Sequence, residues 1–260
     1  MALARGRGLR VALFPSRVTL LPYAFAHPAA VVPVAKMLGA RAVPSALAIG
    51  AMIPDAWYIV PLLERDHGHE LPGALLFCIP AGLLAYAAFH LIFKQPLLAL
   101  APRWLAERLA PWATPGLPRA RWHRVLLSLL AGIATHLAWD ALTHAEYFSI
   151  LETPVAGGIR LHQVLQHAST LLGTWFLAAW IRRKLHATQP MAAALGALDD
   201  RIRYAVMAAM VGLPAAAFLI ALRAFEAEPA PLALRAAGVT ALSAFGLLAL
   251  FFSVGWKLAR

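Results

Sequence analysis

Two histidines and an aspartate lie close together at one end of an apolar stretch of the sequence, residues 125–143. Residues 135–144 read THLAWDALTH, which spaces His136, Asp140 and His144 four residues apart. Residues at this spacing project from the same side of an α-helix, so the three side chains would share one face. Imidazole and carboxylate groups together bind Zn²⁺, Mn²⁺ or Fe²⁺, whereas a hydrogen-bonded His–Asp pair that locks two helices together is the alternative without a metal. One helix cannot supply a complete ligand set, so a metal site here requires donors from elsewhere in the chain.

The composition is that of a protein embedded in a membrane. Hydrophobic residues make up 61% of the 260 residues, charged residues only 13%, and the mean hydropathy is +0.69. Soluble domains carry about 25% charged residues. The net charge is +11, but the basic residues lie between apolar stretches and form no single stripe. We therefore interpret them as topology signals that face anionic membrane lipids, not as a nucleic-acid surface.

Six apolar stretches are each long enough to cross the ~30 Å hydrocarbon core as a helix. They cover approximately residues 44–63, 71–93, 125–143, 161–181, 203–222 and 236–256. Residues 29–38 are too short to span and end at Gly39, which indicates a buried or re-entrant half-helix. Residues 1–20 carry four arginines without the apolar core of a signal peptide, which predicts a disordered basic extension. The predicted fold is all-α and polytopic, with about six transmembrane helices and an N-terminal half-helix.

Basic residues concentrate in two of the predicted loops, residues 94–124 and 182–203. Such loops stay on the cytoplasmic side, which predicts cytoplasmic termini for a protein of the inner (plasma) membrane. This orientation places several polar residues at one depth, near the outer face: Asp55, His69, His136, Asp140, His144 and His167. Independent structural histidines would not be confined to one leaflet, so the clustering favours one metal site over separate packing roles. The same topology places His90, His123 and His186 on the cytoplasmic side.

His27 directly precedes the predicted half-helix. If this helix descends to a cytoplasmic turn at residues 36–41, its ~1.5 Å rise per residue lifts His27 to the outer half of the membrane, beside the other polar residues. That position conflicts with a cytoplasmic extension just before it. The hypothesis that the native chain begins near Val18 or Leu21 resolves the conflict.

From Leu21 onward the sequence resembles DUF4184, a family of integral membrane proteins. Five motifs carry the resemblance in order: LPYAFAHPAA (21–30), AIGAMIPD (48–55), HELPGALLFCIP (69–80), THLAWDALTH (135–144) and LQHASTLLG (165–173). The resemblance covers about residues 21–185 and implies a membrane core over that range. Residues 1–20 would then be an extension, and residues 186–260 two packing transmembrane helices of the same domain.

The order His, Pro-Asp, His, His-x-x-x-Asp, His is also similar, more distantly, to the ligand pattern of zinc-dependent phospholipases C and of membrane-bound metal-dependent hydrolases. This resemblance implies a first metal, with zinc expected before manganese or iron, on four residues: Asp55, His69, His136 and Asp140. Three further residues would bind a second metal or contact the substrate: His27, His144 and His167. Asp55 would act as a ligand or as the general base.

Two functions of different classes follow from the sequence. The first is a metal-dependent hydrolase that acts on a lipid or lipid-linked (phospho)ester at the outer leaflet, with membrane lipids as its partners. The second is a non-enzymatic membrane protein, either a metal- or proton-coupled transporter or a scaffold with a structural metal site. A transporter should carry polar groups through the full depth of the membrane, often with an internal repeat, and we find neither in the sequence.

Overall fold

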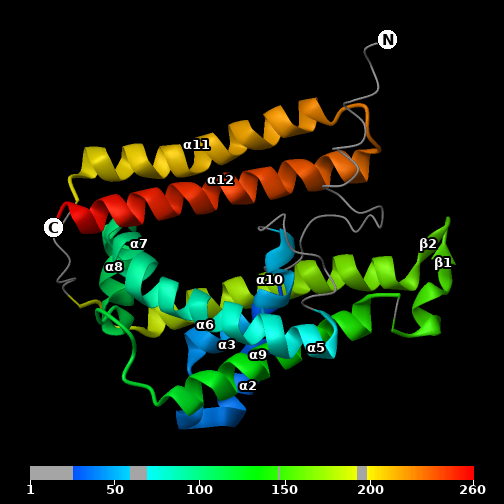
Figure 1. The fold of residues 1–260 in the computed structure, drawn as a ribbon, viewed down its shortest axis with the longest axis horizontal. Coiled ribbons are helices and arrows are strands. Elements are labelled where there is room, and N and C mark those ends of the chain that lie inside the picture. The colour runs from blue at the N-terminus through cyan, green and yellow to red at the C-terminus, as the bar shows by residue number, and fades with distance from the viewer. Residues whose placement is uncertain (1–25, 59–68, 146, 192–197) are drawn as a thin grey trace. The chain divides into compact units, whose positions relative to one another are not determined.

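The computed structural model describes residues 26–58, 69–145, 147–191 and 198–260, and the fold in these ranges is all-α apart from one short hairpin (Figure 1). These residues form two units, which are described separately: residues 26–57 with 69–191, and residues 198–260. The predicted basic extension, residues 1–20, lies outside the described residues, and so does the proposed start near Val18 or Leu21.

The larger unit is built around α9 (Trp122–Thr143), which packs against α2, α3, α6 and α10. Its helices in chain order are α2 (Pro28–Leu38), α3 (Pro44–Gly50), α5 (Leu71–Gly73), α6 (Ile79–Ala88), α7 (Lys94–Leu100), α8 (Arg103–Leu109), α9 and α10 (Leu161–Ala187). Short helical turns join them: η2 (Gly39–Arg41), η3 (Ile53–Tyr58), η6 (Ala110–Trp112), η7 (Ser149–Glu152) and the π-helical turns η4 (Ala74–Cys78) and η5 (Phe89–Phe93). The strands β1 (Pro154–Ala156) and β2 (Ile159–Arg160) pair antiparallel just before α10.

The backbones of α3 and α9 approach each other closely at two glycines. A Cβ atom on Gly132 would lie 2.3 Å from the Leu47 carbonyl oxygen, and one on Gly50 would lie 2.3 Å from the Leu129 carbonyl oxygen. Only glycine permits this approach, because any larger residue would force the backbones apart. The buried Ser128 hydroxyl accepts a hydrogen bond of 2.9 Å from the Val43 amide and fixes the start of α3 against α9.

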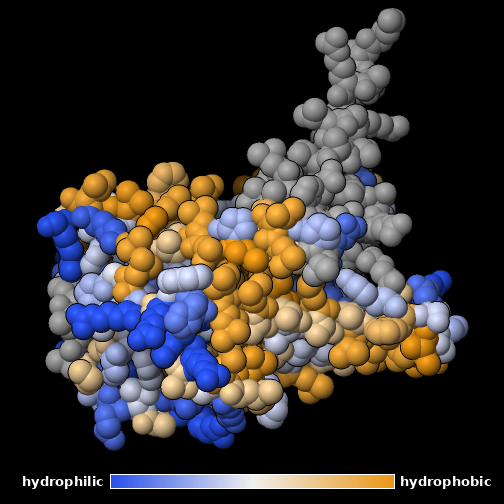
Figure 2. Space-filling view, turned by 60° about the horizontal axis from the view of Figure 1, so that its bottom comes forward, coloured by the Kyte–Doolittle hydropathy of each residue, from blue (hydrophilic) through white to orange (hydrophobic). Residues whose placement is uncertain are grey.

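Four helices are long and apolar enough to cross a membrane, not the six that the sequence predicts. They are Ala74–Leu100, Trp122–Thr143, Asp200–Ala224 and Ala230–Leu258. Figure 2 shows apolar side chains over much of the face that it presents. These are features of a membrane-embedded protein, so the membrane assignment and the all-α class stand, with fewer candidate spans among the described residues.

The predicted span over residues 44–63 is wrong, because the chain there forms α3 and then the separate 3₁₀ turn η3. Pro54 has no amide hydrogen and cannot bond to the carbonyl of Gly50, so α3 ends at that point. The predicted span over residues 161–181 forms a helix, α10, but Gln163, Gln166 and neighbouring polar residues leave it below the hydropathy of a candidate span.

The short helix predicted for residues 29–38 is confirmed as α2, and Gly39 ends it with a φ of +51°. The second unit consists of α11 (Asp200–Ala224) and α12 (Ala230–Leu258), which pack against each other and confirm the last two predicted spans. The Asp199 carboxylate accepts a hydrogen bond from the Arg201 amide and caps α11.

Replacement of Gly132 by Ala should destabilise the protein, because the new Cβ meets backbone atoms that cannot move aside separately. We expect a loss of ~1–3 kcal/mol, read as a lower midpoint of thermal unfolding in detergent. Gly246→Ala in α12 is the matched control, since a Cβ there meets nothing within 4 Å. An equal midpoint for Gly132→Ala and Gly246→Ala would show that α3 and α9 do not approach as closely as described.

Candidate metal centre

His136 and Asp140 lie one helical turn apart on the buried side of α9. His136 is fully buried and Asp140 is 3% exposed. The His136 Nδ1 lies 2.8 Å from the Ala51 carbonyl oxygen, which can only accept, so Nδ1 carries the hydrogen. This bond fixes the ring and directs its other nitrogen, Nε2, toward Asp140, whose Oδ2 is 3.5 Å away. A histidine that binds a metal through one ring nitrogen usually donates a hydrogen bond from the other nitrogen, as His136 does here to Ala51.

Asp55 and His69 also lie beside His136 and Asp140. Asp55 comes from the segment that ends before residue 59, and His69 from the segment that begins after residue 68. Asp55 is positioned by η3, directly after Pro54, and His69 precedes α5. The His69 Nε2 lies 3.1 Å from Asp140 Oδ2, 3.5 Å from Asp55 Oδ1 and 3.3 Å from His136 Nε2. The His136 Nε2 is 3.8 Å from Asp55 Oδ1. The donor groups of Asp55, His69, His136 and Asp140 therefore face one another, although they come from three separate parts of the sequence.

His27 completes this group from the start of α2. Its Nε2 lies 3.6 Å from Asp140 Oδ1 and 4.0 Å from Asp55 Oδ2, and its ring centroid is 4.0 Å from that of His136. Pro28 occupies the first position of α2, so the helix begins where His27 turns toward α9. We call the five residues His27, Asp55, His69, His136 and Asp140 the His/Asp centre.

The geometry of the His/Asp centre fits a divalent cation. Two overlapping sets of donors each have ligand atoms within 4.8 Å of one another: His27, Asp55 and His136, and His69, His136 and Asp140. Ligand atoms around a tetrahedral zinc ion with bonds of ~2.0–2.1 Å lie about 3.3 Å apart, close to the separations found here. Three imidazoles and two carboxylates suit Zn²⁺, Mn²⁺ or Fe²⁺. His136 belongs to both sets, so it is the common ligand.

The charges of the centre are set by the surroundings of each group. Burial lowers the pKa of His27 to about 4, assisted by the neighbouring His136 imidazole. Burial alone would also lower the pKa of His69, but hydrogen bonds to Asp140 and Asp55 outweigh it and raise the pKa to about 9. Burial would raise the pKa of Asp55, yet its hydrogen bond with His69 and the nearby imidazoles lower it. At neutral pH Asp55 is thus ionised, and a metal would displace the His69 proton.

The family model for the domain of unknown function DUF4184 matches residues 21–254. The chain belongs to the DUF4184 family. The match begins where the sequence resemblance begins and extends past residue 185 to include α11 and most of α12. No curated protein and no solved structure matches the chain significantly, so the similarity to phospholipases C is not shown by these comparisons.

In this DUF4184 protein, the structure groups His27 with the residues expected to bind the first metal, and it does not group His144 or His167 with them. The His144 Nδ1 lies 3.6 Å from Asp140 Oδ1, but His144 is in neither set of mutually close donors among the described residues. His167 is exposed, and its Nδ1 lies 2.6 Å from the Gln163 carbonyl oxygen of its own helix. The three candidates for a second metal or for substrate contact, His27, His144 and His167, therefore form no set of mutually close donors among the described residues.

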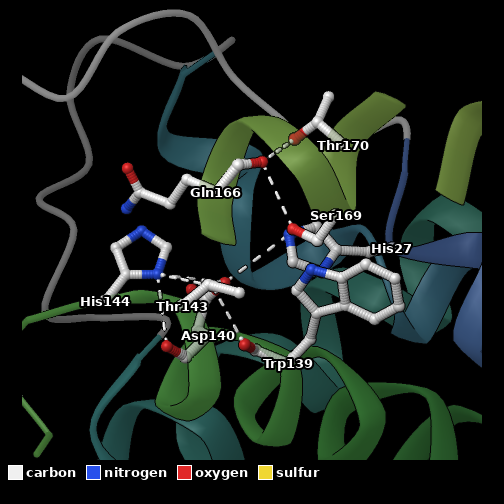
Figure 3. A pocket seen from close by; sticks show the side chains of 8 residues that line it. All are labelled: His27, Trp139, Asp140, Thr143, His144, Gln166, Ser169 and Thr170. Carbon is white, nitrogen blue, oxygen red and sulfur yellow. Dashed lines mark hydrogen bonds and ion pairs between the residues drawn. The ribbon is translucent and has the colours of Figure 1, made fainter. Parts of the chain in front are cut away.

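Gln166 of α10 lies at the site, although it is not among the predicted ligands. It is 8% exposed, and it lines a pocket with His27, Asp140 and His144 (Figure 3). The motif LQHASTLLG contains Gln166, but adjacent residues on a helix point about 100° apart, so the sequence alone does not show whether Gln166 or His167 faces inward.

We expect the purified protein to hold a tightly bound divalent ion, measured as metal content per chain in detergent. His136→Ala and Asp140→Ala should each lose it, because they remove central ligands, with a decrease in affinity beyond the ~10–100-fold typical of a supporting residue. His167→Ala is the control and should retain the metal. A metal-free wild type after reconstitution with Zn²⁺, Mn²⁺ and Fe²⁺, with all variants folded, would exclude a metal centre.

Proposed function

We propose that the protein is a membrane-embedded metal-dependent hydrolase that acts on a lipid or lipid-linked (phospho)ester. The observation that carries this proposal is the position of the His/Asp centre, which is buried among α2, η3 and α9 yet borders a small, partly open pocket through His27 and Asp140. A purely structural metal site is normally closed by its ligands, whereas a catalytic site keeps an accessible side. This centre has such a side.

The residues of the centre have different tasks in the proposed reaction. A divalent cation at this site would acidify water and stabilise negative charge on a phosphoryl or acyl oxygen. The Ala51 carbonyl fixes the orientation of the His136 ring, which keeps Nε2 beside the Asp140 carboxylate. Asp55 is suited to accept the proton of the attacking water, because its side chain is 11% exposed while that of Asp140 is 4% exposed.

Exposed apolar side chains beside the pocket support a lipid substrate. Leu142, next to Thr143 of the pocket, is 64% exposed, and Leu171, next to Thr170, is 72% exposed. Leu172 follows with 64% exposure. Such side chains are stable in contact with hydrocarbon, so an acyl chain can lie along α9 and α10 while the polar part of the same molecule reaches the centre.

The proposed orientation places this site at the outer face of the inner membrane, with both termini cytoplasmic. Within α9, His136 and Asp140 lie toward the C-terminal end, whereas Arg121 and Arg124 lie at the N-terminal end. The basic loop and the centre therefore lie at opposite ends of one candidate span, and the positive-inside rule assigns the basic end to the cytoplasm.

The metal-loaded protein should hydrolyse the soluble phosphodiester bis(p-nitrophenyl) phosphate and lipid phosphodiesters in vesicles. Asp55→Asn should reduce kcat by ~10²–10⁴-fold through loss of the proton acceptor, and Asp140→Asn should lose both metal and activity. The exposed His123→Ala should retain full activity. A metal-loaded wild type that hydrolyses neither substrate class would overturn the hydrolase proposal, and metal uptake by vesicles containing it would favour transport.

Cysteine labelling tests the orientation without reference to chemistry. Cys78 is the only cysteine and is buried, so single exposed cysteines can be introduced after Cys78→Ser. Ser149→Cys should react with a membrane-impermeant maleimide in intact cells, and Thr114→Cys only after permeabilisation, since both positions are exposed in loops at opposite ends of α9. The reverse pattern would place the centre at the cytoplasmic face.

A further inference from the structure

A small polar pocket lies beside the His/Asp centre, between α9 and α10 (Figure 3). It is bordered by Asp140 and Thr143 of α9 and by Gln166, Ser169 and Thr170 of α10, and we call it the polar pocket. The pocket is partly open and has room for a single group of about the size of a water molecule. Only one end of a larger molecule can therefore enter it, while the rest of that molecule stays outside.

The two oxygens of the Asp140 carboxylate have different surroundings. Oδ2 belongs to the His/Asp centre, 3.1 Å from His69 Nε2 and 3.5 Å from His136 Nε2. Oδ1 is buried and makes no hydrogen bond among the described residues, although a nitrogen of His27 and one of His144 each lie 3.6 Å away. A buried carboxylate oxygen without a donor is costly, and a hydrogen-bond donor in the polar pocket would remove that cost.

The hydroxyl groups of the polar pocket have already used their hydrogens. Thr143 Oγ1 donates to the Trp139 carbonyl at 3.0 Å. Ser169 Oγ and Thr170 Oγ1 both donate to the Gln166 carbonyl, at 3.2 Å and 2.7 Å. A hydroxyl has one hydrogen and two lone pairs, so each of these oxygens presents only acceptors to a ligand. The pocket therefore requires a ligand that donates several hydrogen bonds within a very small volume.

A primary ammonium group meets this requirement better than a hydroxyl group does. An ammonium nitrogen at the end of a chain carries three hydrogens and a positive charge, whereas a hydroxyl carries one hydrogen and no charge. A hydrogen bond from a cation to a carboxylate is also about twice as strong as one between neutral groups. A quaternary ammonium is excluded, because its methyl groups exceed the space of one water molecule and it has no hydrogen to donate.

The charge of the neighbouring centre points to the same kind of group. A divalent cation there would be balanced by the carboxylates of Asp55 and Asp140, so a bound phosphodiester would add an uncompensated negative charge. A buried charge is costly unless an opposite charge accompanies it. Among the described lining residues of the polar pocket none is Lys or Arg, so the lining does not supply that positive charge. An ammonium group in the same substrate molecule would supply it.

We infer that the polar pocket binds the primary ammonium group of an ethanolamine head group, so the preferred substrates are lipid phosphodiesters of ethanolamine. This inference rests on the proposed hydrolase, which places the phosphoester at the His/Asp centre. Asp140 contributes one oxygen to the centre and the other to the pocket, so the short two-carbon chain of ethanolamine can join the two sites.

Two related head groups should be poor ligands for different reasons. The trimethylated nitrogen of choline is too large for the pocket and donates no hydrogen bond. The serine head group carries a carboxylate beside its ammonium, and this carboxylate would face the acceptors of the pocket with no Lys or Arg among the described lining residues to compensate it.

Binding of soluble head groups tests the inference without requiring hydrolysis. The full-length, zinc-loaded protein in detergent should bind phosphoethanolamine about tenfold more tightly than phosphocholine in calorimetric titrations, the effect of a hydrogen bond to a charged group. The double variant Ser169→Ala/Thr170→Val removes two acceptors and should reduce this preference while retaining its zinc. Thr174→Val is the matched control, since Thr174 is exposed one turn further along α10, and it should bind as the wild type does.

Two results of the titrations would overturn the inference. One is equal affinity of the wild type for phosphoethanolamine and phosphocholine, and the other is an unchanged preference in the double variant. Competition distinguishes an ammonium site from a site for any small cation. Ammonium chloride should displace phosphoethanolamine more effectively than sodium chloride does at the same ionic strength, and equal displacement by both salts would also overturn the inference.

Hydrolysis separates failure of the inference from failure of the proposed function. With vesicle substrates, kcat/KM for phosphatidylethanolamine should exceed the values for phosphatidylcholine and phosphatidylserine about tenfold, and the double variant should reduce this preference. Hydrolysis of all three lipids without head-group preference would refute the polar pocket as a subsite and leave the hydrolase intact. Selective binding of phosphoethanolamine without any hydrolysis would retain the pocket and refute the hydrolase.

Discussion

The contact between the backbones of α3 and α9 at Gly50 and Gly132 is the constraint on which the centre depends. It brings the end of α3 so close to α9 that the Ala51 carbonyl accepts the hydrogen of His136 Nδ1. The same contact positions η3, which follows α3 after a short turn and carries Asp55. Because α3 and η3 replace one long helix here, the junction between them can lie in the interior. There the Ala51 carbonyl and the Asp55 carboxylate face α9.

Ionisable groups inside a membrane protein are stable only when they compensate one another. In the His/Asp centre three imidazoles surround two carboxylates, and each carboxylate lies within 4.0 Å of all three of these imidazoles. A second polar group, in which His90 lies 2.9 Å from the Ser45 hydroxyl and 3.0 Å from Lys94 Nζ, is separate from this centre and contains no carboxylate in those contacts. Proximity of carboxylates distinguishes a metal-binding arrangement from one that only connects helices.

Local sequence patterns predicted α2, α9, α11 and α12, because hydropathy and terminating glycines act within a few residues. They failed at residues 44–63, where Pro54 and the contact of Gly50 with α9 divide an apolar stretch into two short elements. They also failed at residues 161–181, where polar side chains that line the pocket lower the hydropathy of the helix. Of the candidate ligands, Asp55, His69, His136 and Asp140 converge as predicted, but whether they bind a metal stays a prediction. His27 joins them as well, beside the other polar residues as the predicted half-helix implied, through the packing of α2 against α9.

Asp140 lies three residues before the end of α9, and this position determines how substrate and water can reach the site. A carboxylate near the end of a span is far less costly to insert than one at the centre of the bilayer. In the proposed orientation, the centre would thus lie close to the boundary between hydrocarbon and water. In the proposed hydrolase, the lipid would arrive sideways through the membrane along α10, while water would enter, and the released polar product leave, from the aqueous side. The two reactants would follow separate routes, so neither would have to displace the other at the entrance.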